Sequence, residues 1–197
     1  MQLVGMLDSP YVRRVAISLY CLDIPFEHKS LSVFRNFEEF ARINPLVKAP
    51  TLISNGGKTL MDSTLILEYL EALSEKSLMP ADLAARQHAL QLIGLALMAC
   101  DKTVQIVYER TLRPIEKQHQ PWIDRVTQQV TAAYDLLEAA TPSLPNSLMQ
   151  SEISVAVAWR FTQQYAPDVI AAADYPTLAA FSQAAEQRPE FTACSPS

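Results

Sequence analysis

The sequence predicts an α/β domain followed by an all-helical domain. Residues 1–75 contain four alanines and three of the four glycines, whereas residues 76–197 contain twenty-one alanines. Apolar residues alternate over short stretches in the first part and recur at helical spacing over long stretches in the second. We therefore expect domains at residues 1–75 and 81–197, joined by a linker at about residues 74–80.

The first part contains short elements that alternate in type. Ser9 followed by Pro10 is a typical helix start, because serine caps helices and proline fits the first helical position. Asn55-Gly56-Gly57 is a strong hairpin signal. Strands are predicted at residues 3–6, 26–31, 51–54 and 58–61. Helices are predicted to about residue 21 after Ser9, at 34–43, and after Asp62 and Ser63. This βαβ unit followed by a ββα unit predicts a thioredoxin-like domain with a mixed four-stranded sheet.

The second part reads as long helices. A run from residue 82 to about 113 stops at Pro114, which cannot continue a helix. The next run opens at Pro121 and reaches about residue 140, before Thr141 and Pro142. Two more helices are predicted at residues 151–165 and 175–187. No repeat of 20–50 residues is visible, so the sequence predicts a helical bundle rather than a solenoid.

Charge and composition argue against several function classes. The formal net charge is −5, and neither part is basic, so we expect no nucleic-acid partner. The longest unbroken apolar run, residues 92–100, is far shorter than the roughly 20 residues that span a bilayer, so we expect no membrane association. The three cysteines are scattered and odd in number, which suits a reducing compartment. We expect a cytoplasmic protein.

Several motifs occur in a distinctive order along the chain. They are Ser9-Pro-Tyr-Val-Arg-Arg, Asn44-Pro-Leu-Val-Lys-Ala-Pro-Thr-Leu, Met61-Asp-Ser-Thr, and the ending Tyr175-Pro-Thr-Leu with Arg188-Pro-Glu-Phe. Over nearly its whole length the chain resembles the glutathione S-transferase superfamily, in particular bacterial members with an active-site serine. The resemblance implies glutathione as co-substrate. It also implies a homodimer, with the helical domain of one subunit packed on the glutathione domain of the other.

Ser9 is the candidate catalytic residue. Its residue type alone favours a helix N-cap. The resemblance implies that the Ser9 hydroxyl binds the glutathione sulfur. Only the thiolate is a good nucleophile, and a hydroxyl donor at a helix N-terminus stabilises it. A cysteine at this position would favour reductase chemistry through mixed disulfides, so serine favours a transferase.

The segment around Pro50 is the second candidate. By itself Pro50 reads as a turn or strand-edge proline. The resemblance implies a cis bond before Pro50, with the backbone of Ala49 pairing with the cysteinyl part of glutathione, as in strand addition. Lys48, or alternatively Arg35 or Asn36, would meet the glycine carboxylate.

Asp62 and Ser63 are the third candidate, at the start of a predicted helix. Both residue types serve as simple N-caps. The resemblance implies that Ser63 and the helix N-terminus bind the γ-glutamyl carboxylate, and that Asp62 meets the glutamyl ammonium. The family usually has Glu or Gln at the position of Asp62.

The second substrate would lie between the domains, against the long helix that follows residue 82. Candidate walls are Leu7, Tyr11, Met98 and Tyr108, although such residues also serve as core. An apolar cleft of this kind takes a hydrophobic electrophile. The histidines are isolated in sequence, so we expect no metal.

The leading hypothesis is a glutathione transferase that conjugates the thiolate to a hydrophobic electrophile. A non-catalytic module of the same fold, acting in protein interaction or stress regulation, is the alternative. Glutathione-dependent peroxidase chemistry remains as a side activity, since it needs only the glutathione thiolate.

Overall fold

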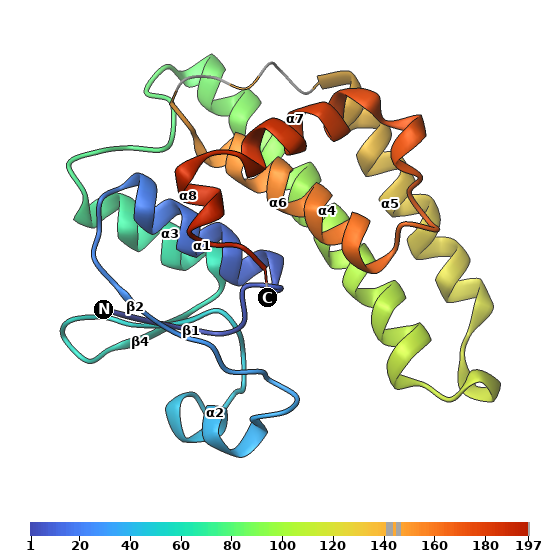
Figure 1. The fold of residues 1–197 in the computed structure, drawn as a ribbon, viewed down its shortest axis with the longest axis horizontal. Helices are drawn as coiled ribbons and strands as arrows, with labels where there is room; N and C mark the ends of the chain where they lie inside the picture. Colours follow the sequence, from blue (N-terminus) through green and yellow to red (C-terminus); the bar gives the residue numbers. More distant parts are fainter. Residues whose placement is uncertain (141–143, 145–146, 197) are drawn as a thin grey trace. The chain divides into compact units, whose positions relative to one another are not determined.

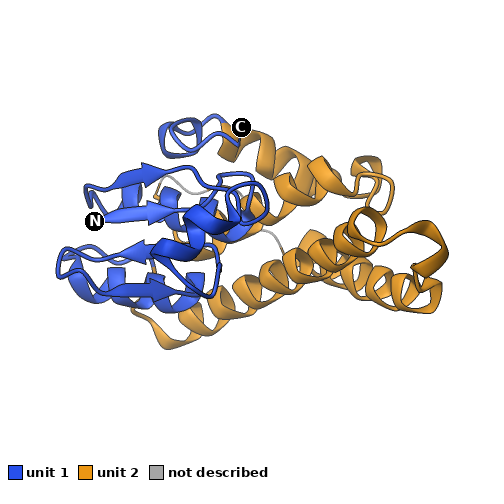
Figure 2. Cartoon of the chain, turned by 90° about the horizontal axis from the view of Figure 1, so that it is seen from below, with its two compact units in different colours: residues 1–78, 187–197 blue, residues 79–186 orange. Residues whose placement is uncertain are grey.

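The computed structural model describes residues 1–140, 144 and 147–196. The chain forms two compact units, Met1–Leu78 with Gln187–Ser197, and Met79–Glu186, which Figure 2 shows in different colours. The sequence assigns all of residues 81–197 to the helical domain, whereas the last residues pack with the first unit. The reason is a set of contacts between the C-terminal segment and the first helix, described below.

A mixed four-stranded sheet forms the centre of the first unit, as predicted. Its strands are β1 (Gln2–Val4), β2 (Glu27–Lys29), β3 (Thr51–Ile53) and β4 (Thr59–Met61). The order is β2-β1-β3-β4, with β1 parallel to β2 and antiparallel to β3, and β3 antiparallel to β4. The register places Leu3 opposite both His28 and Leu52.

Helices cover both faces of this sheet (Figure 1). Helices α1 (Pro10–Cys21) and α3 (Ser63–Leu73) lie on one side, and α2 (Phe37–Ile43) lies on the other. Beneath α2, the buried side chains of Val4, Leu31 and Phe40 form an apolar cluster. Burial of these side chains fixes α2 to the sheet, because apolar burial is the main favourable term in folding.

Helix α3 carries two apolar faces. Ile66, Leu67 and Leu70 are buried. Three large apolar residues of the same helix are exposed: Leu65 by 59%, Tyr69 by 36% and Leu73 by 51%. A spacing of four residues aligns these three on one face of the helix, so α3 presents an apolar stripe that the first unit does not cover.

The last residues of the chain form a short helix that the sequence did not predict. Helix α8 (Pro189–Thr192) packs against α1, and Phe191 is fully buried. Arg13 of α1, which is 2% exposed, contacts this segment. The Arg13 guanidinium lies 5.5 Å from the centre of the Phe191 ring.

The second unit is a helical bundle, as predicted. Its helices are α4 (Leu83–Leu112), α5 (Gln120–Ala140), α6 (Gln150–Tyr165) and α7 (Pro176–Glu186), with 3-10 turns η1 (Ile115–Lys117) and η2 (Ala172–Asp174). Helix α4 packs on α5 and α6, and α7 packs on α6 and α5. Thr141 and Pro142, where the sequence predicts a helix end, lie outside the described residues.

Aromatic rings fill the centre of the bundle. Tyr134, Trp159 and Tyr175 meet edge to face, with ring centres 5.4 to 6.0 Å apart. The Tyr134 hydroxyl donates to Thr162 Oγ1 over 2.6 Å, and that oxygen also bonds Thr103 Oγ1. Burial raises the pKa of Tyr134 well above its ordinary value, so this hydroxyl stays protonated and serves packing.

Helix α4 is long enough and apolar enough to span a membrane, judged by length and composition alone. The core helix of a helical bundle meets the same criteria. Here the buried residues of α4, including Leu92, Ala96, Ala99 and Ile106, belong to the core of the second unit.

Candidate functional site

Ser9 precedes the first residue of α1. Its backbone is extended, Pro10 occupies the first helical position, and the Ser9 carbonyl accepts the Arg13 N–H over 2.9 Å. Among the described residues the Ser9 side chain makes no capping hydrogen bond. The backbone of Ser9 alone therefore fills the N-cap role that its residue type favours. Ser9 is half-buried, and its hydroxyl lies at a helix N-terminus, where an anion is stabilised.

The bond between Ala49 and Pro50 is cis, as the resemblance implies. Buried Asn44 and Thr51 hold this loop: Asn44 Nδ2 donates to Thr51 Oγ1 over 2.9 Å, and Thr51 Oγ1 donates to the Lys48 carbonyl over 2.6 Å. Within the described chain, neither the N–H nor the carbonyl of Ala49 takes part in a backbone hydrogen bond. This backbone is thus available to pair with an extended peptide.

Gly5 lies against the same loop and was not singled out from the sequence. Its φ is +139°, and a Cβ at this position would lie 2.6 Å from Val12 Cγ2 and 3.2 Å from Ala49 Cβ. The His28 Nε2 lies 2.8 Å from the Gly5 carbonyl oxygen. Only glycine allows the end of β1 to approach Ala49 this closely.

Asp62 and Ser63 stand at the start of α3. Asp62 is the N-cap, at a φ of 69°, and its Oδ1 accepts the Thr64 N–H over 2.9 Å. Asp62 therefore caps α3, as its residue type predicts. The amides of Ser63 and Leu65 have no hydrogen-bond acceptor among the described residues. Open amides at a helix N-terminus form an anion site.

Arg14 joins α1 to this helix start, and the sequence analysis gave it no role. It is 3% exposed, and its Nη1 donates to Ser63 Oγ over 3.2 Å and to Thr64 Oγ1 over 3.4 Å. A buried positive charge therefore lies directly behind the two hydroxyls that open α3. Two consecutive arginines between the apolar residues Val12 and Val15 were a sequence signal for buried charge, but not for its partner.

Lys48 and Arg35, the candidates for the glycine carboxylate, are both exposed. Arg35 Nη2 lies 3.4 Å from Met6 Sδ, so its guanidinium reaches the loop that leads to Ser9. The alternative, Asn36, holds its own loop, because its Oδ1 accepts the Ser32 N–H over 3.1 Å.

The four candidates for the second-substrate wall fall in different units. Leu7 and Tyr11 are half-buried residues of the first unit. Met98 and Tyr108 are 38% and 42% exposed on α4 in the second unit. The last two are ten residues apart, which separates them by about 15 Å along the helix axis.

The cysteines do not supply a reactive thiol. Burial is the main cause that raises the pKa of Cys21 to about 12, with the Glu190 carboxylate adding to it. Burial also raises the pKa of Cys194 to about 12. Cys100 is 3% exposed. Because the thiolate is the reactive form, any nucleophilic sulfur must come from a ligand.

The described part of the chain contains no group of three or more metal-ligating side chains.

Two comparisons of sequence point to one family. Residues 3–77 match the family model described as "Glutathione S-transferase, N-terminal domain". The Escherichia coli protein named "Uncharacterized GST-like protein YibF" is 30% identical over 139 residues, which cover 70% of this chain and 68% of that protein.

Solved structures are similar over the whole chain. A glutathione transferase family member from Pseudomonas fluorescens, with bound glutathione, is 30% identical, covers 100% of this chain and 98% of its own, and has a TM-score of 0.88. A glutathione S-transferase from Methylobacterium radiotolerans, in complex with glutathione sulfonate, is 25% identical, with coverage of 99% and 94% and a TM-score of 0.91. Family match, full-length similarity and a shared fold lead to one conclusion: this chain belongs to the glutathione S-transferase family.

Proposed function

We propose that the protein is a glutathione transferase, which binds reduced glutathione, stabilises its thiolate and conjugates it to a hydrophobic electrophile. The observation that carries the proposal is the hydrogen bond from Arg14 Nη1 to Ser63 Oγ at the open N-terminus of α3. Structures of relatives with bound glutathione and with glutathione sulfonate support the choice of ligand.

The two ends of glutathione would be bound separately. The γ-glutamyl carboxylate would accept hydrogen bonds from the Ser63 hydroxyl and the open amides of α3. Asp62 would meet the glutamyl ammonium with the carboxylate oxygen that does not cap the helix. Lys48 or Arg35 would pair with the glycine carboxylate, and the Ala49 backbone would align the cysteinyl residue between these ends.

Ser9 would then act on the sulfur. Its hydroxyl would donate a hydrogen bond to the thiolate at the N-terminus of α1. A free thiol has a pKa of about 8.5. Lowering that pKa by two requires about 2.7 kcal/mol of preferential thiolate binding, within reach of a charge-assisted hydrogen bond and a helix dipole together.

The reaction follows from the ionised sulfur. The thiol proton passes to solvent, the sulfur lone pair forms a bond to an electrophilic carbon, and a leaving group departs with its electron pair. Where the electrophile is an activated double bond, the adjacent carbon takes up a proton instead. Leu7, Tyr11, Met98 and Tyr108 remain the proposed contacts of this second substrate.

We further propose a cytoplasmic homodimer. The exposed stripe of Leu65, Tyr69 and Leu73 on α3 supports the dimer, because such stripes are usually covered in a working assembly. Three free cysteines support a reducing compartment.

Calorimetric titration with reduced glutathione tests the proposal. We expect the wild type to bind, and Ser63→Ala to bind at least about tenfold more weakly, as loss of a hydrogen bond to a charged group predicts. Asp82→Ala, which removes the N-cap of α4 instead, is the matched control and keeps wild-type affinity.

The absorbance of the glutathione thiolate, measured against pH, helps to distinguish the transferase from the non-catalytic module and from the peroxidase. In the wild-type complex we expect a thiol pKa well below 8.5, and in Ser9→Ala a value near that of free glutathione. No binding at millimolar glutathione would exclude the transferase and favour the non-catalytic module. Binding with a lowered thiol pKa, but turnover only with a hydroperoxide, would favour the peroxidase.

A further inference from the structure

A hollow of about 350 Å³ lies where α4 meets α5, in the second unit. It is lined by Glu109 in the last turn of α4, Arg113 directly after α4, His119 directly before α5 and Trp122 in the first turn of α5. We call it the hairpin hollow. Its volume is at the lower end of the range for small-molecule sites. Nothing in the proposed transferase chemistry uses these residues.

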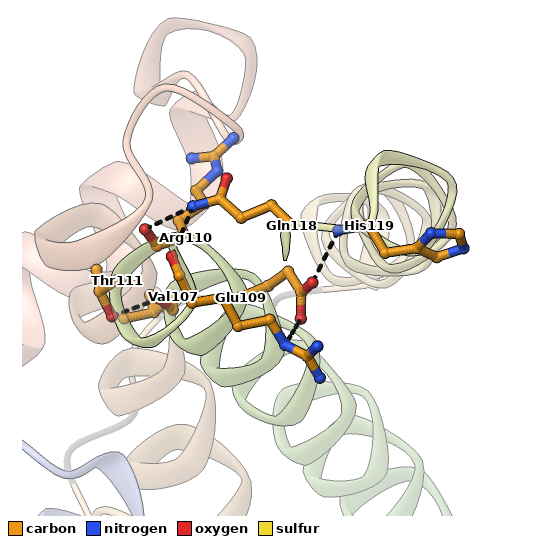
Figure 3. Close-up of polar contacts among 7 residues, drawn as sticks. Val107, Glu109, Arg110, Thr111, Gln118 and His119 are labelled. Atoms are coloured by element: carbon orange, nitrogen blue, oxygen red, sulfur yellow. Dashed lines mark hydrogen bonds and ion pairs between the residues drawn. The ribbon is translucent and has the colours of Figure 1, made fainter. Parts of the chain in front are cut away.

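Both carboxylate oxygens of Glu109 accept hydrogen bonds from neighbouring residues (Figure 3). Its Oε1 accepts the His119 backbone N–H over 2.9 Å, and its Oε2 accepts Arg113 Nε over 2.9 Å. The Glu109 side chain is 9% exposed. With both oxygens bonded and its charge paired, this carboxylate is not a site for a further cation.

Arg113 supplies the hydrogen-bond donors of the hairpin hollow. Its Nε is bonded to Glu109, while the side chain is 59% exposed. A guanidinium has five N–H groups in a fixed plane. The Nε bond therefore orients that plane and leaves the outer edge, Nη1 and Nη2, for a ligand oxygen pair. The start of α5 adds the positive end of a 21-residue helix.

Trp122 supplies an apolar wall. It is 39% exposed, whereas the only other tryptophan, Trp159, is 4% exposed in the bundle core. An exposed indole face favours stacking with a flat ring. The hairpin hollow thus combines one oriented guanidinium edge with one aromatic wall.

We propose that the hairpin hollow is a binding site for a planar aromatic anion, a carboxylate or sulfonate, held by Arg113 and stacked on Trp122. The guanidinium edge matches the two oxygens of a carboxylate, which is the geometry of a bidentate pair. The site is separate from the proposed glutathione chemistry and does not depend on it.

The test uses 4-nitrobenzoate as probe and 4-nitrobenzamide as its neutral counterpart. Nitroaromatic compounds quench indole emission on contact, so Trp122 reports binding while buried Trp159 provides a constant background. We expect saturable quenching by 4-nitrobenzoate and at least fivefold weaker binding of the amide. The same titration by calorimetry gives the affinity where Trp122 is replaced.

Two variants and one matched control decide the outcome. Arg113→Gln should weaken 4-nitrobenzoate binding by five- to tenfold, in line with the worth of an exposed charge-assisted bond. Trp122→Phe should also weaken it, by a smaller factor, because the phenyl ring offers less area for stacking than the indole. Arg110→Gln should not, because Arg110, near the same end of α4, pairs with Asp168 instead and does not line the hollow. Equal affinity in Arg113→Gln, Arg110→Gln and wild type would overturn the proposal. So would an absence of saturable quenching, or equal binding of acid and amide.

Arg113→Gln also removes the partner of Glu109. If this variant fails to fold, as judged from Trp159 emission, Arg113→Lys replaces it. Lysine keeps the positive charge but cannot make a bidentate pair, so we expect an affinity between those of wild type and Arg113→Gln. Unchanged affinity in both Arg113→Lys and Trp122→Phe would also overturn the proposal.

Discussion

Arg13 Nε donates a hydrogen bond to the Cys194 carbonyl oxygen over 2.8 Å, and so joins α1 to the end of the chain. The same guanidinium lies over the Phe191 ring, and its Nη2 is 3.5 Å from the Phe191 carbonyl oxygen. Arg14, the next residue, faces the start of α3. Two adjacent buried arginines therefore serve different parts of the first unit, and they can be tested against each other.

Arg13→Gln should destabilise the protein. The change removes charge-assisted hydrogen bonds to buried carbonyls, and we expect a loss of about 3 kcal/mol in the free energy of unfolding. Urea unfolding followed by circular dichroism measures it. Glutathione affinity of the folded variant should stay at the wild-type value. An unchanged unfolding midpoint would show that α8 is held by other contacts.

Arg14→Gln should act on glutathione binding. The change withdraws a positive charge from behind Ser63, so we expect about tenfold weaker binding of glutathione. In turnover assays KM should rise more than kcat falls, since the glutamyl end is remote from the sulfur. Arg14→Lys should restore part of the affinity, and Arg13→Gln is the matched control. Equal losses of affinity in both arginine variants would point to a general structural effect.

Gly5→Ala should disturb the loop before β3. The new Cβ would meet Val12 and Ala49 at 2.6 and 3.2 Å, at a φ of +139°, and we expect destabilisation of about 1–3 kcal/mol. Glutathione binding should weaken with it, because Ala49 must shift. Gly56→Ala is the control, since its nearest neighbour is Ser54 Oγ at 4.0 Å. Equal changes in stability and in glutathione affinity in Gly5→Ala and Gly56→Ala would contradict the role of Gly5.

Stability should fall in alkaline solution. Burial is the main cause that raises the pKa of both Cys21 and Cys194 to about 12. The folded state keeps these protons while the unfolded chain loses them near the ordinary value of 9.0. The contribution is therefore present below about pH 9 and is lost as the pH rises toward 12.

Urea unfolding at pH 7, 9 and 10.5 measures this loss. The Cys21→Ala and Cys194→Ala double variant should lose less stability over the same range than the wild type. If the free energy of unfolding of the double variant falls with pH as steeply as that of the wild type, the effect belongs to other groups. Tyr175 is one such group, because burial also raises its pKa to about 12.

The sequence predicts those parts of the fold whose signals are local. Ser9 with Pro10 marks the start of α1, Asn55-Gly56-Gly57 marks the hairpin between β3 and β4, and Pro114 marks the end of α4, which stops at Leu112. In each case the residues that specify the structure are neighbours along the chain, so their pattern is readable without the fold.

Parts that depend on distant contacts were not predicted. Helix α8 is only four residues long, and Arg13, which bonds the Phe191 and Cys194 carbonyls, lies 181 residues before Cys194. The candidate site shows the same limit. Ser9 and Ser63 are motif residues, whereas the partner of Ser63 is Arg14, 49 residues away. Two neighbouring arginines on one helix carry no local sign of which distant group each will meet.

The first unit is built from both ends of the chain. Domains that are continuous in sequence can finish folding while later residues are still being synthesised. Here residues 79–186, the whole second unit, are synthesised between Arg13 and its carbonyl partners at Phe191 and Cys194. The contacts of Arg13 with α8 can therefore form only after the second unit has been synthesised.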